Sequence, residues 1–164
     1  MQTIWTKPIL GGLLIGLIGL LARALPAWSA PRSYLGGGVS FQGLATSPAT
    51  FGGNVTGRWQ VEGAPISLRS SVLFGREGTA IVPTISWDVP AGDRLNFFVG
   101  AGGTFTLDQG ATLVGNRSAL AVQPGVELSL NDRWVWYGNA IVPINGATDG
   151  SAGIALQSGI GFQF

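Results

Sequence analysis

The chain contains no cysteine and no histidine, and its single methionine is Met1. Without cysteine no disulfide can form, and without cysteine or histidine the common ligands of transition metals are missing. The absence of histidine also removes the side chain that most often acts as a general base near neutral pH. We therefore expect no catalytic residue, no metal site and no cofactor.

Charge is also scarce. Charged residues make up 10% of the chain, against roughly 25% in an ordinary soluble domain, and they offer no basic surface for nucleic acid. Hydrophobic residues reach 46%. Yet beyond residue 22 the sequence has no apolar run of about 18 residues, the length that a membrane-spanning helix needs. A hydrophobic chain of this kind is either an all-β soluble domain or a membrane β-barrel.

The first 30 residues are typical of a cleaved secretory signal. A lysine precedes an apolar stretch over residues 8–22, and small residues follow. Cleavage after Ser29 or after Ala30 would leave residues 31–164 as one barrel domain, a size typical of a single domain. The alternative is a retained N-terminal anchor.

From residue 32 onward, the chain divides into eight runs in which apolar residues alternate with polar or small ones. The last run is the clearest: from Ile154 to Phe164 every second residue is apolar except Ser158. This period of two is the signature of a strand with different surroundings on its two faces. In the fifth run Phe98 falls in the polar register, so we expect it to pack inside. The eight runs cover residues 33–42, 54–61, 66–74, 79–89, 95–104, 118–128, 134–142 and 151–164.

The connections between these runs differ in length. Those after the second, fourth and sixth runs are short, at 62–65, 90–94 and 129–133, whereas those after the first, fifth and seventh have about ten residues. An even number of strands, with short turns at one end and longer loops at the other, predicts an eight-stranded antiparallel up-and-down transmembrane β-barrel.

The polar register decides which face points inward. It is poor in charge and rich in glycine, serine, threonine and glutamine, which suits the narrow lumen of an eight-stranded barrel better than a solvated exterior. The apolar register then faces lipid; in the alternative, a lipocalin-like soluble barrel, it would form the core. With both termini on the periplasmic side, the aromatic residues gather at one interface as a girdle. The predicted girdle consists of Trp59, Trp87, Phe97, Trp134, Trp136 and Phe162.

The chain resembles the small eight-stranded outer-membrane barrels of the opacity-protein and OmpA-transmembrane type. The resemblance is carried by YLGGGVSF at 34–41, FFVGAGGTF at 97–105, QPGVELSL at 123–130 and the terminal phenylalanine. It implies a location in the outer membrane and a C-terminal signal that the barrel-assembly machinery reads, formed by Phe164, Phe162 and Ile160. Two prolines depart from an ideal strand, because each removes a ladder donor, and we expect a bulge, a kink or a different strand boundary there. These are Pro83 and Pro124.

Charged residues in the polar register form the one candidate functional site that the sequence indicates. If Val61 pairs with Ile66 across the first short turn, Arg58 and Arg69 face each other inside the barrel and need carboxylates nearby. Three readings are open: a structural ion-pair network that plugs the lumen, a gate that admits small solutes, or a ligand site. The carboxylates that this register points inward are Glu62, Asp88 and Glu127.

The resemblance and the composition lead to a monomeric integral outer-membrane protein with a structural or cell-surface role and a lumen filled by polar side chains. The alternative is a narrow porin-like pore or a small-solute-binding barrel. Lipid A palmitoyltransferase and lipid A deacylase have a similar architecture but rely on a histidine that is missing here. The expected partners are outer-membrane lipid, the assembly machinery and a possible surface ligand of the loops at 43–54, 107–116 and 144–153.

Overall fold

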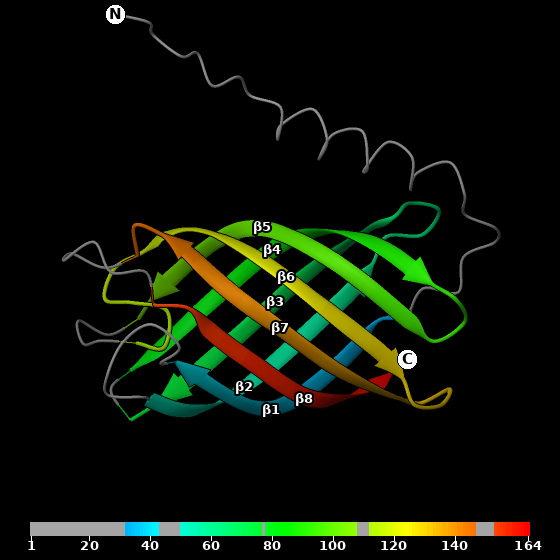
Figure 1. Cartoon of the computed structure of the whole chain (residues 1–164), viewed down its shortest axis with the longest axis horizontal. Helices are drawn as coiled ribbons and strands as arrows, with labels where there is room; N and C mark the ends of the chain where they lie inside the picture. Colours follow the sequence, from blue (N-terminus) through cyan, green and yellow to red (C-terminus); the bar gives the residue numbers. More distant parts are fainter. Residues whose placement is uncertain (1–31, 43–49, 77, 108–111, 147–152) are drawn as a thin grey trace, which may run out of the picture.

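The chain folds into a closed barrel of eight antiparallel strands (Figure 1). The computed structural model describes residues 32–42, 50–76, 78–107, 112–146 and 153–164, so the predicted signal lies outside the described residues. Each strand pairs with its neighbours in sequence, and β1 pairs with β8 to close the barrel, which confirms the predicted fold. The strands are β1 (Tyr34–Gln42), β2 (Thr50–Gln60), β3 (Ile66–Gly75), β4 (Thr79–Ala91), β5 (Leu95–Thr106), β6 (Ala119–Ser129), β7 (Trp134–Ile144) and β8 (Ala155–Gln163).

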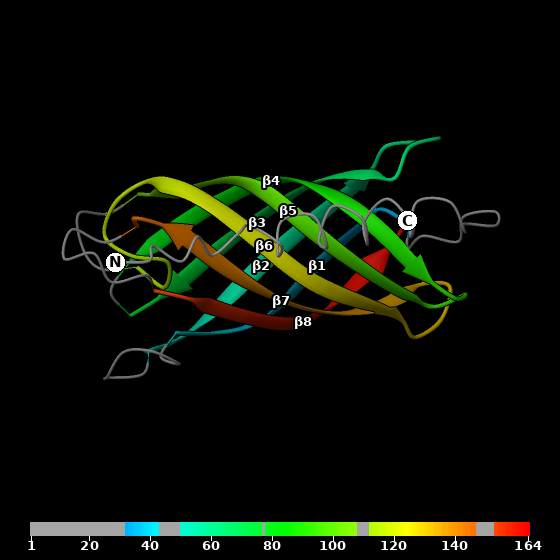
Figure 2. The ribbon, with the colours of Figure 1, turned by 45° about the horizontal axis from the view of Figure 1, so that its top comes forward.

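The two ends of the barrel differ. Three short turns, at 61–65, 92–94 and 130–133, lie at one end together with the C-terminus, on the right in Figure 1, and we call this the short-turn end. Gly63 and Gly92 have positive φ there, a conformation that glycine adopts without steric cost. The opposite end carries the other four connections, and we call it the long-loop end. Figure 2 shows the same barrel turned about its length.

Side chains alternate between the two faces of the sheet, as the pleat of a strand requires. Large apolar residues such as Val39, Ile85 and Leu120 are exposed on the outer wall, whereas the serine, threonine and amide residues of the other register are buried inside. Among the described residues, no helix is long and apolar enough to cross a membrane.

Two predicted strand starts are wrong by four residues: β2 begins at Thr50 rather than at residue 54, and β8 begins at Ala155 rather than at residue 151. In β2, Phe51, Gly52 and Gly53 pair with the last residues of β1, in a stretch that we predicted to belong to the loop at 43–54. Two consecutive glycines have low β-propensity, and here pairing with the neighbouring strand overrides that local preference.

The two strand prolines interrupt the ladder without shifting its register. On β4 the pairs Ile81–Phe105 and Thr84–Gly102 flank Pro83 with the same offset, so no bulge forms, and the pairing with β5 skips residues 82 and 83. The pairing of β6 with β7 skips residues 123 and 124 in the same way. Each proline thus loses its ladder contact on one side only, and neither bulges the strand.

The interior is divided into three layers along the barrel axis. Ionic side chains fill the short-turn end, and neutral polar side chains fill the middle. At the long-loop end the interior is apolar. The apolar layer consists of Leu73, Ala80, Val82, Leu113, Val114, Ala121, Ile141 and Ala155. The polar lumen predicted from the sequence therefore extends over the short-turn and middle layers only.

Candidate functional site

Arg58 and Arg69 lie opposite each other on β2 and β3, in the register that the first short turn predicts. Val61 donates its backbone N–H to the carbonyl of Ile66 at 3.0 Å, which closes that turn. Arg58 and Arg69 each lie three residues from this turn pair, and the alternation of the pleat directs both guanidinium groups into the lumen. Both arginines are buried, with 2% and 4% of their surface exposed. Two like charges are thus held side by side away from water.

Two carboxylates neutralise this pair, and each of them bridges both arginines. Asp88 on β4 accepts from Arg58 at 3.1 Å and from Arg69 at 2.9 Å. Glu127 on β6 pairs with the same arginines, at 3.7 Å from Nε of Arg58 and closer to Arg69. The four charges sum to zero, which is the condition for holding ions in a low-dielectric interior.

Neutral donors complete the coordination of the carboxylates. The hydroxyl of Tyr34 donates to Glu127 at 2.9 Å, and the amide of Asn96 donates to Glu127 at 2.9 Å and to Asp88 at 3.3 Å. Ser67 donates to Asp88 and accepts from Nε of Arg58. The network therefore links six consecutive strands, from β1 to β6. These neutral partners were not predicted from the sequence, although all of them lie in the polar register.

Phe98 also belongs to this layer. It is buried, as the sequence predicts, and its ring centroid lies 3.5 Å from the guanidinium carbon of Arg69. The face of an aromatic ring attracts a cation, most strongly where water is excluded. A phenylalanine in the polar register was a signal that the sequence contained but that we interpreted only as packing.

The prediction that Glu62 points into the lumen is wrong. Glu62 lies in the turn after β2 and is exposed to solvent, because β2 ends at Gln60 and the alternation of the strand stops there. The network thus has two carboxylates rather than three, which matches the two arginines. Within the described ranges, no group of acidic residues is arranged to hold a metal ion.

The neutral polar layer fills the middle of the barrel, on the long-loop side of the four charged residues. Tyr137 donates to Asn54 at 2.6 Å and stacks on Tyr34, with ring centroids 5.8 Å apart. Space for Tyr34 comes from Gly161 on β8, since a Cβ there would lie 2.6 Å from the tyrosine ring. Two buried polar atoms, Oδ1 of Asn96 and Nε2 of Gln157, have no hydrogen-bond partner among the described residues.

A loop segment closes the long-loop end of the lumen. Residues 112–115 form a tight turn in which Leu113 and Val114 are 2% and 0% exposed. The backbone N–H of Asn116 donates to the carbonyl of Gly146 at 3.1 Å, which ties this loop to the connection after β7. We therefore call residues 112–115 the apolar plug. From the sequence this loop was expected only to take part in binding a possible surface ligand, although its adjacent leucine and valine were an available signal of burial.

The predicted aromatic girdle lies on the outer wall at the short-turn end. Trp134 packs against Phe162 with centroids 5.5 Å apart, and Trp59 packs against Phe164 at 6.4 Å. Trp136 is less exposed, and its indole N–H donates to Ser158 at 3.1 Å. The members of the predicted girdle that are exposed by more than a third are Trp59, Trp87, Phe97, Trp134 and Phe162.

Four phenylalanines on β1, β2, β3 and β5 lie near the long-loop end, and we call them the second aromatic ring. Phe41 and Phe51 contact each other with centroids 4.9 Å apart, and Phe74 on β3 and Phe105 on β5 are exposed. The outer wall between the two rings is apolar. Trp59 and Phe51 are eight residues apart on β2 (59 − 51), which at about 3.3 Å per residue and a tilt of about 40° separates the rings by about 20 Å.

Comparison with solved structures finds the same fold in small outer-membrane barrels. Ail, the attachment invasion locus protein of Yersinia pestis, matches with a TM-score of 0.57 at 14% identity, over 80% of this chain and 97% of that one. Neisserial surface protein A matches with a TM-score of 0.57 at 10% identity, over 80% and 97%. The N-terminal barrel domain of Pseudomonas aeruginosa OprF matches with a TM-score of 0.53 at 12% identity, over 82% and 100%.

A de novo designed transmembrane β-barrel also matches, with a TM-score of 0.59 at 10% identity, over 81% of this chain and 96% of the design. No protein-family model and no curated protein matches the sequence. The similarity to natural and designed barrels at such low identity shows the fold alone. The chain has the fold of the small eight-stranded transmembrane β-barrels.

Proposed function

We propose that the chain is an integral outer-membrane protein with a structural or cell-surface role and a closed lumen. The observation that carries this proposal is the closure of the interior at both ends. Four buried ions with their hydrogen-bond partners occupy the short-turn end, and Leu113 and Val114 occupy the long-loop end. Side chains that fill both ends would block the passage of solutes, as a closed lumen requires.

The outer wall supports the membrane location. An exposed apolar belt around the whole barrel would be unfavourable in water, whereas in lipid it matches the hydrocarbon core. The separation of about 20 Å between the two aromatic rings is close to the apolar band of about 25 Å in outer-membrane barrels. Short turns in such barrels are periplasmic, so we assign the tryptophan ring to the periplasmic interface and the plug to the cell surface.

The proposed role is not catalytic. Asp88 and Glu127, the buried carboxylates of the lumen, are both held in ion pairs with arginines. The surface role is also supported by analogy, since two of the similar barrels are named as an attachment invasion protein and a surface protein. The long-loop end would present the corresponding surface here.

Planar bilayer recording tests the closed lumen. The purified barrel should give no conductance above the lipid background, and the variant Glu62→Gln should behave identically because Glu62 lies outside the network. A steady conductance that changes on Arg69→Gln would favour the alternative, a narrow pore. A surface role predicts that replacing residues 43–49 and 147–152 by glycine–serine linkers lowers the adhesion of expressing cells while the barrel remains folded.

A further inference from the structure

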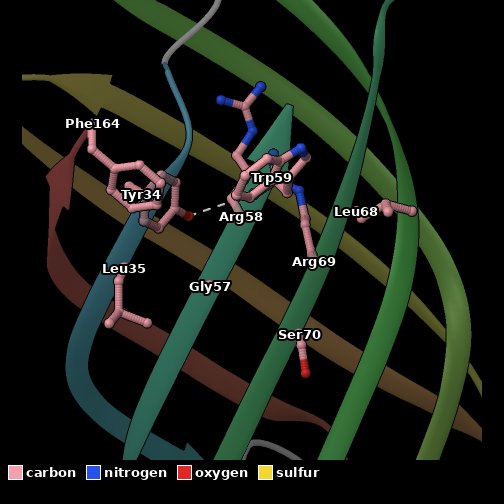
Figure 3. Close-up of a pocket in the computed structure, with 9 residues that line it drawn as sticks. All are labelled: Tyr34, Leu35, Gly57, Arg58, Trp59, Leu68, Arg69, Ser70 and Phe164. Carbon is pink, nitrogen blue, oxygen red and sulfur yellow. Dashed lines mark hydrogen bonds between the residues drawn. The ribbon is translucent and has the colours of Figure 1, made fainter. Parts of the chain in front are cut away.

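The outer wall of the barrel has an apolar groove near the short-turn end. It has a volume of about 380 Å³, within the range of about 300–1,000 Å³ found for ligand pockets. The groove crosses β1, β2 and β3, and Figure 3 shows its lining residues around the middle strand. Its walls are the side chains of Leu35, Trp59, Leu68 and Phe164, and Gly57 lies on its floor.

The groove is open at its floor because two small residues lie side by side on neighbouring strands. Leu35 pairs with Gly57, and Gly57 pairs with Ser70, so a missing side chain and a short one lie next to each other. A Cβ placed on Gly57 would contact only Cδ1 of Leu35, at 3.9 Å, which means that the space above the glycine is open. The hollow is therefore a property of the sequence at these two positions.

Among the outward-facing residues that line the groove, Ser70 is the polar one. Ser70 is exposed on the outer wall, and its hydroxyl has no hydrogen bond to the residues that the structure describes. A hydroxyl in contact with hydrocarbon is costly unless it finds a partner. In a lipid environment the available partners are the ester carbonyls of the lipids themselves.

Arg32 belongs to the short segment that precedes β1, just beyond the groove. Ser33 accepts from the backbone of Phe164 at 2.9 Å and, through its hydroxyl, from the backbone of Gln60 at 3.1 Å. These bonds hold residues 32–33 between the ends of β8 and β2, next to the aromatic wall of the groove. Arg32 is exposed there, and a guanidinium group matches a phosphate in charge and geometry.

We propose that this groove binds one glycerophospholipid of the membrane leaflet at the short-turn end. One acyl chain lies over Gly57 between the apolar walls, Ser70 donates to an ester carbonyl, and the phosphate pairs with Arg32. The inference rests on the proposed membrane location, since the groove is continuous with the lipid-facing belt. That continuity favours a lipid over a second copy of the chain as the occupant.

Gly57→Leu fills the groove and leaves the lumen unchanged, because position 57 faces outward and has room for a side chain. Gly37→Leu is the matched control. Gly37 also faces outward, on the neighbouring strand and outside the groove, and a Cβ there would contact only a backbone oxygen at 3.6 Å. Arg32→Gln tests the phosphate contact alone.

The full chain is expressed, and the barrel is placed in vesicles of phosphatidylglycerol and phosphatidylethanolamine. It is then extracted from these vesicles, and native mass spectrometry counts the phospholipids that remain bound. We expect one phospholipid to remain on the wild type and on Gly37→Leu. Its occupancy should fall about tenfold on Gly57→Leu, a loss equivalent to about 1.4 kcal/mol. Arg32→Gln should retain lipid but lose the preference for phosphatidylglycerol, because the anionic headgroup no longer meets a cation.

Equal lipid retention by Gly57→Leu and Gly37→Leu would overturn the proposal, as would a wild-type barrel that carries no lipid. Dimers of the wild type that Gly57→Leu abolishes would also overturn it and assign the groove to a second copy. Each sample is first tested for a heat-dependent shift in gel mobility. A wild-type chain that shows no shift contradicts the membrane barrel itself, whereas a folded barrel without lipid contradicts only this inference.

Discussion

Arg58 and Arg69, direct register partners on β2 and β3, donate to different oxygens of the same carboxylate, that of Asp88. Two positive charges are thereby buried side by side, and their repulsion is offset only as long as both carboxylates stay ionised. A buried ion pair contributes little compared with a well-packed apolar pair, but an unpaired buried charge is strongly destabilising. This asymmetry makes the network testable.

Neutralising one carboxylate should destabilise the barrel. Glu127→Gln leaves a net positive charge in the closed lumen, and we expect the free energy of unfolding to fall by about 3–5 kcal/mol. Urea unfolding in detergent micelles, followed by tryptophan fluorescence, measures this change. Glu62→Gln, at an exposed turn position, should change it by less than about 0.5 kcal/mol. Equal effects of the two variants would contradict the assigned network.

Removing both partners of one ion pair should cost less than the sum of the two single changes. In Arg69→Met combined with Glu127→Gln, the remaining Arg58 and Asp88 still form a neutral pair at 3.1 Å. A double-mutant cycle on unfolding free energies should therefore give a coupling of about 1–3 kcal/mol. Strict additivity would show that the two side chains do not interact.

Much of the fold follows from patterns that the sequence displays. The alternation in the run ending at Phe164 predicts both faces of β8, and the first short turn fixes the offset that places Arg58 opposite Arg69. In a closed barrel the register of one strand pair constrains the register of the next, so one correctly predicted turn determines which residues face inward on several strands. The prediction that the apolar face points outward followed from the composition of the polar register, which has few charges and many small polar side chains.

Other features depended on contacts that are distant in sequence. Asn96 donates to Asp88 and also to Glu127, which is 31 residues after Asn96, and no local pattern indicates the second bond. The burial of Leu113 depends on how a loop turns back over the barrel, which alternation cannot predict. Glu62 was placed inside because the alternation was continued into the turn, two residues past Gln60, where β2 ends.

The apolar plug should contribute measurably to stability. Leu113→Ala removes a side chain that is 2% exposed, and such truncations cost about 2–5 kcal/mol. Leu107→Ala, at an exposed position in the same connection, should cost less than about 1 kcal/mol. The comparison uses thermal unfolding in micelles. A smaller loss for Leu113→Ala than for Leu107→Ala would show that the segment does not occupy the lumen.

The glycines of β8 should be sensitive to a single methyl group where they face tyrosines. Gly161→Ala places a Cβ 2.6 Å from the ring of Tyr34, and overpacking of this kind costs about 1–3 kcal/mol. Gly37→Ala on the outer wall meets no side chain and should be nearly neutral. Urea midpoints of the two variants provide the measurement, and similar midpoints would contradict the stacked arrangement of the lumen tyrosines.

The central claim is that the apolar face of this barrel meets lipid. Membrane fractionation of cells that express the full chain, with boiled and unboiled samples compared on a detergent gel, tests it most directly. A closed barrel keeps every strand edge paired, so detergent alone does not unfold it. We predict a heat-dependent mobility shift in the outer-membrane fraction. A soluble periplasmic protein without a shift would contradict the claim, because the apolar register would then be a buried core.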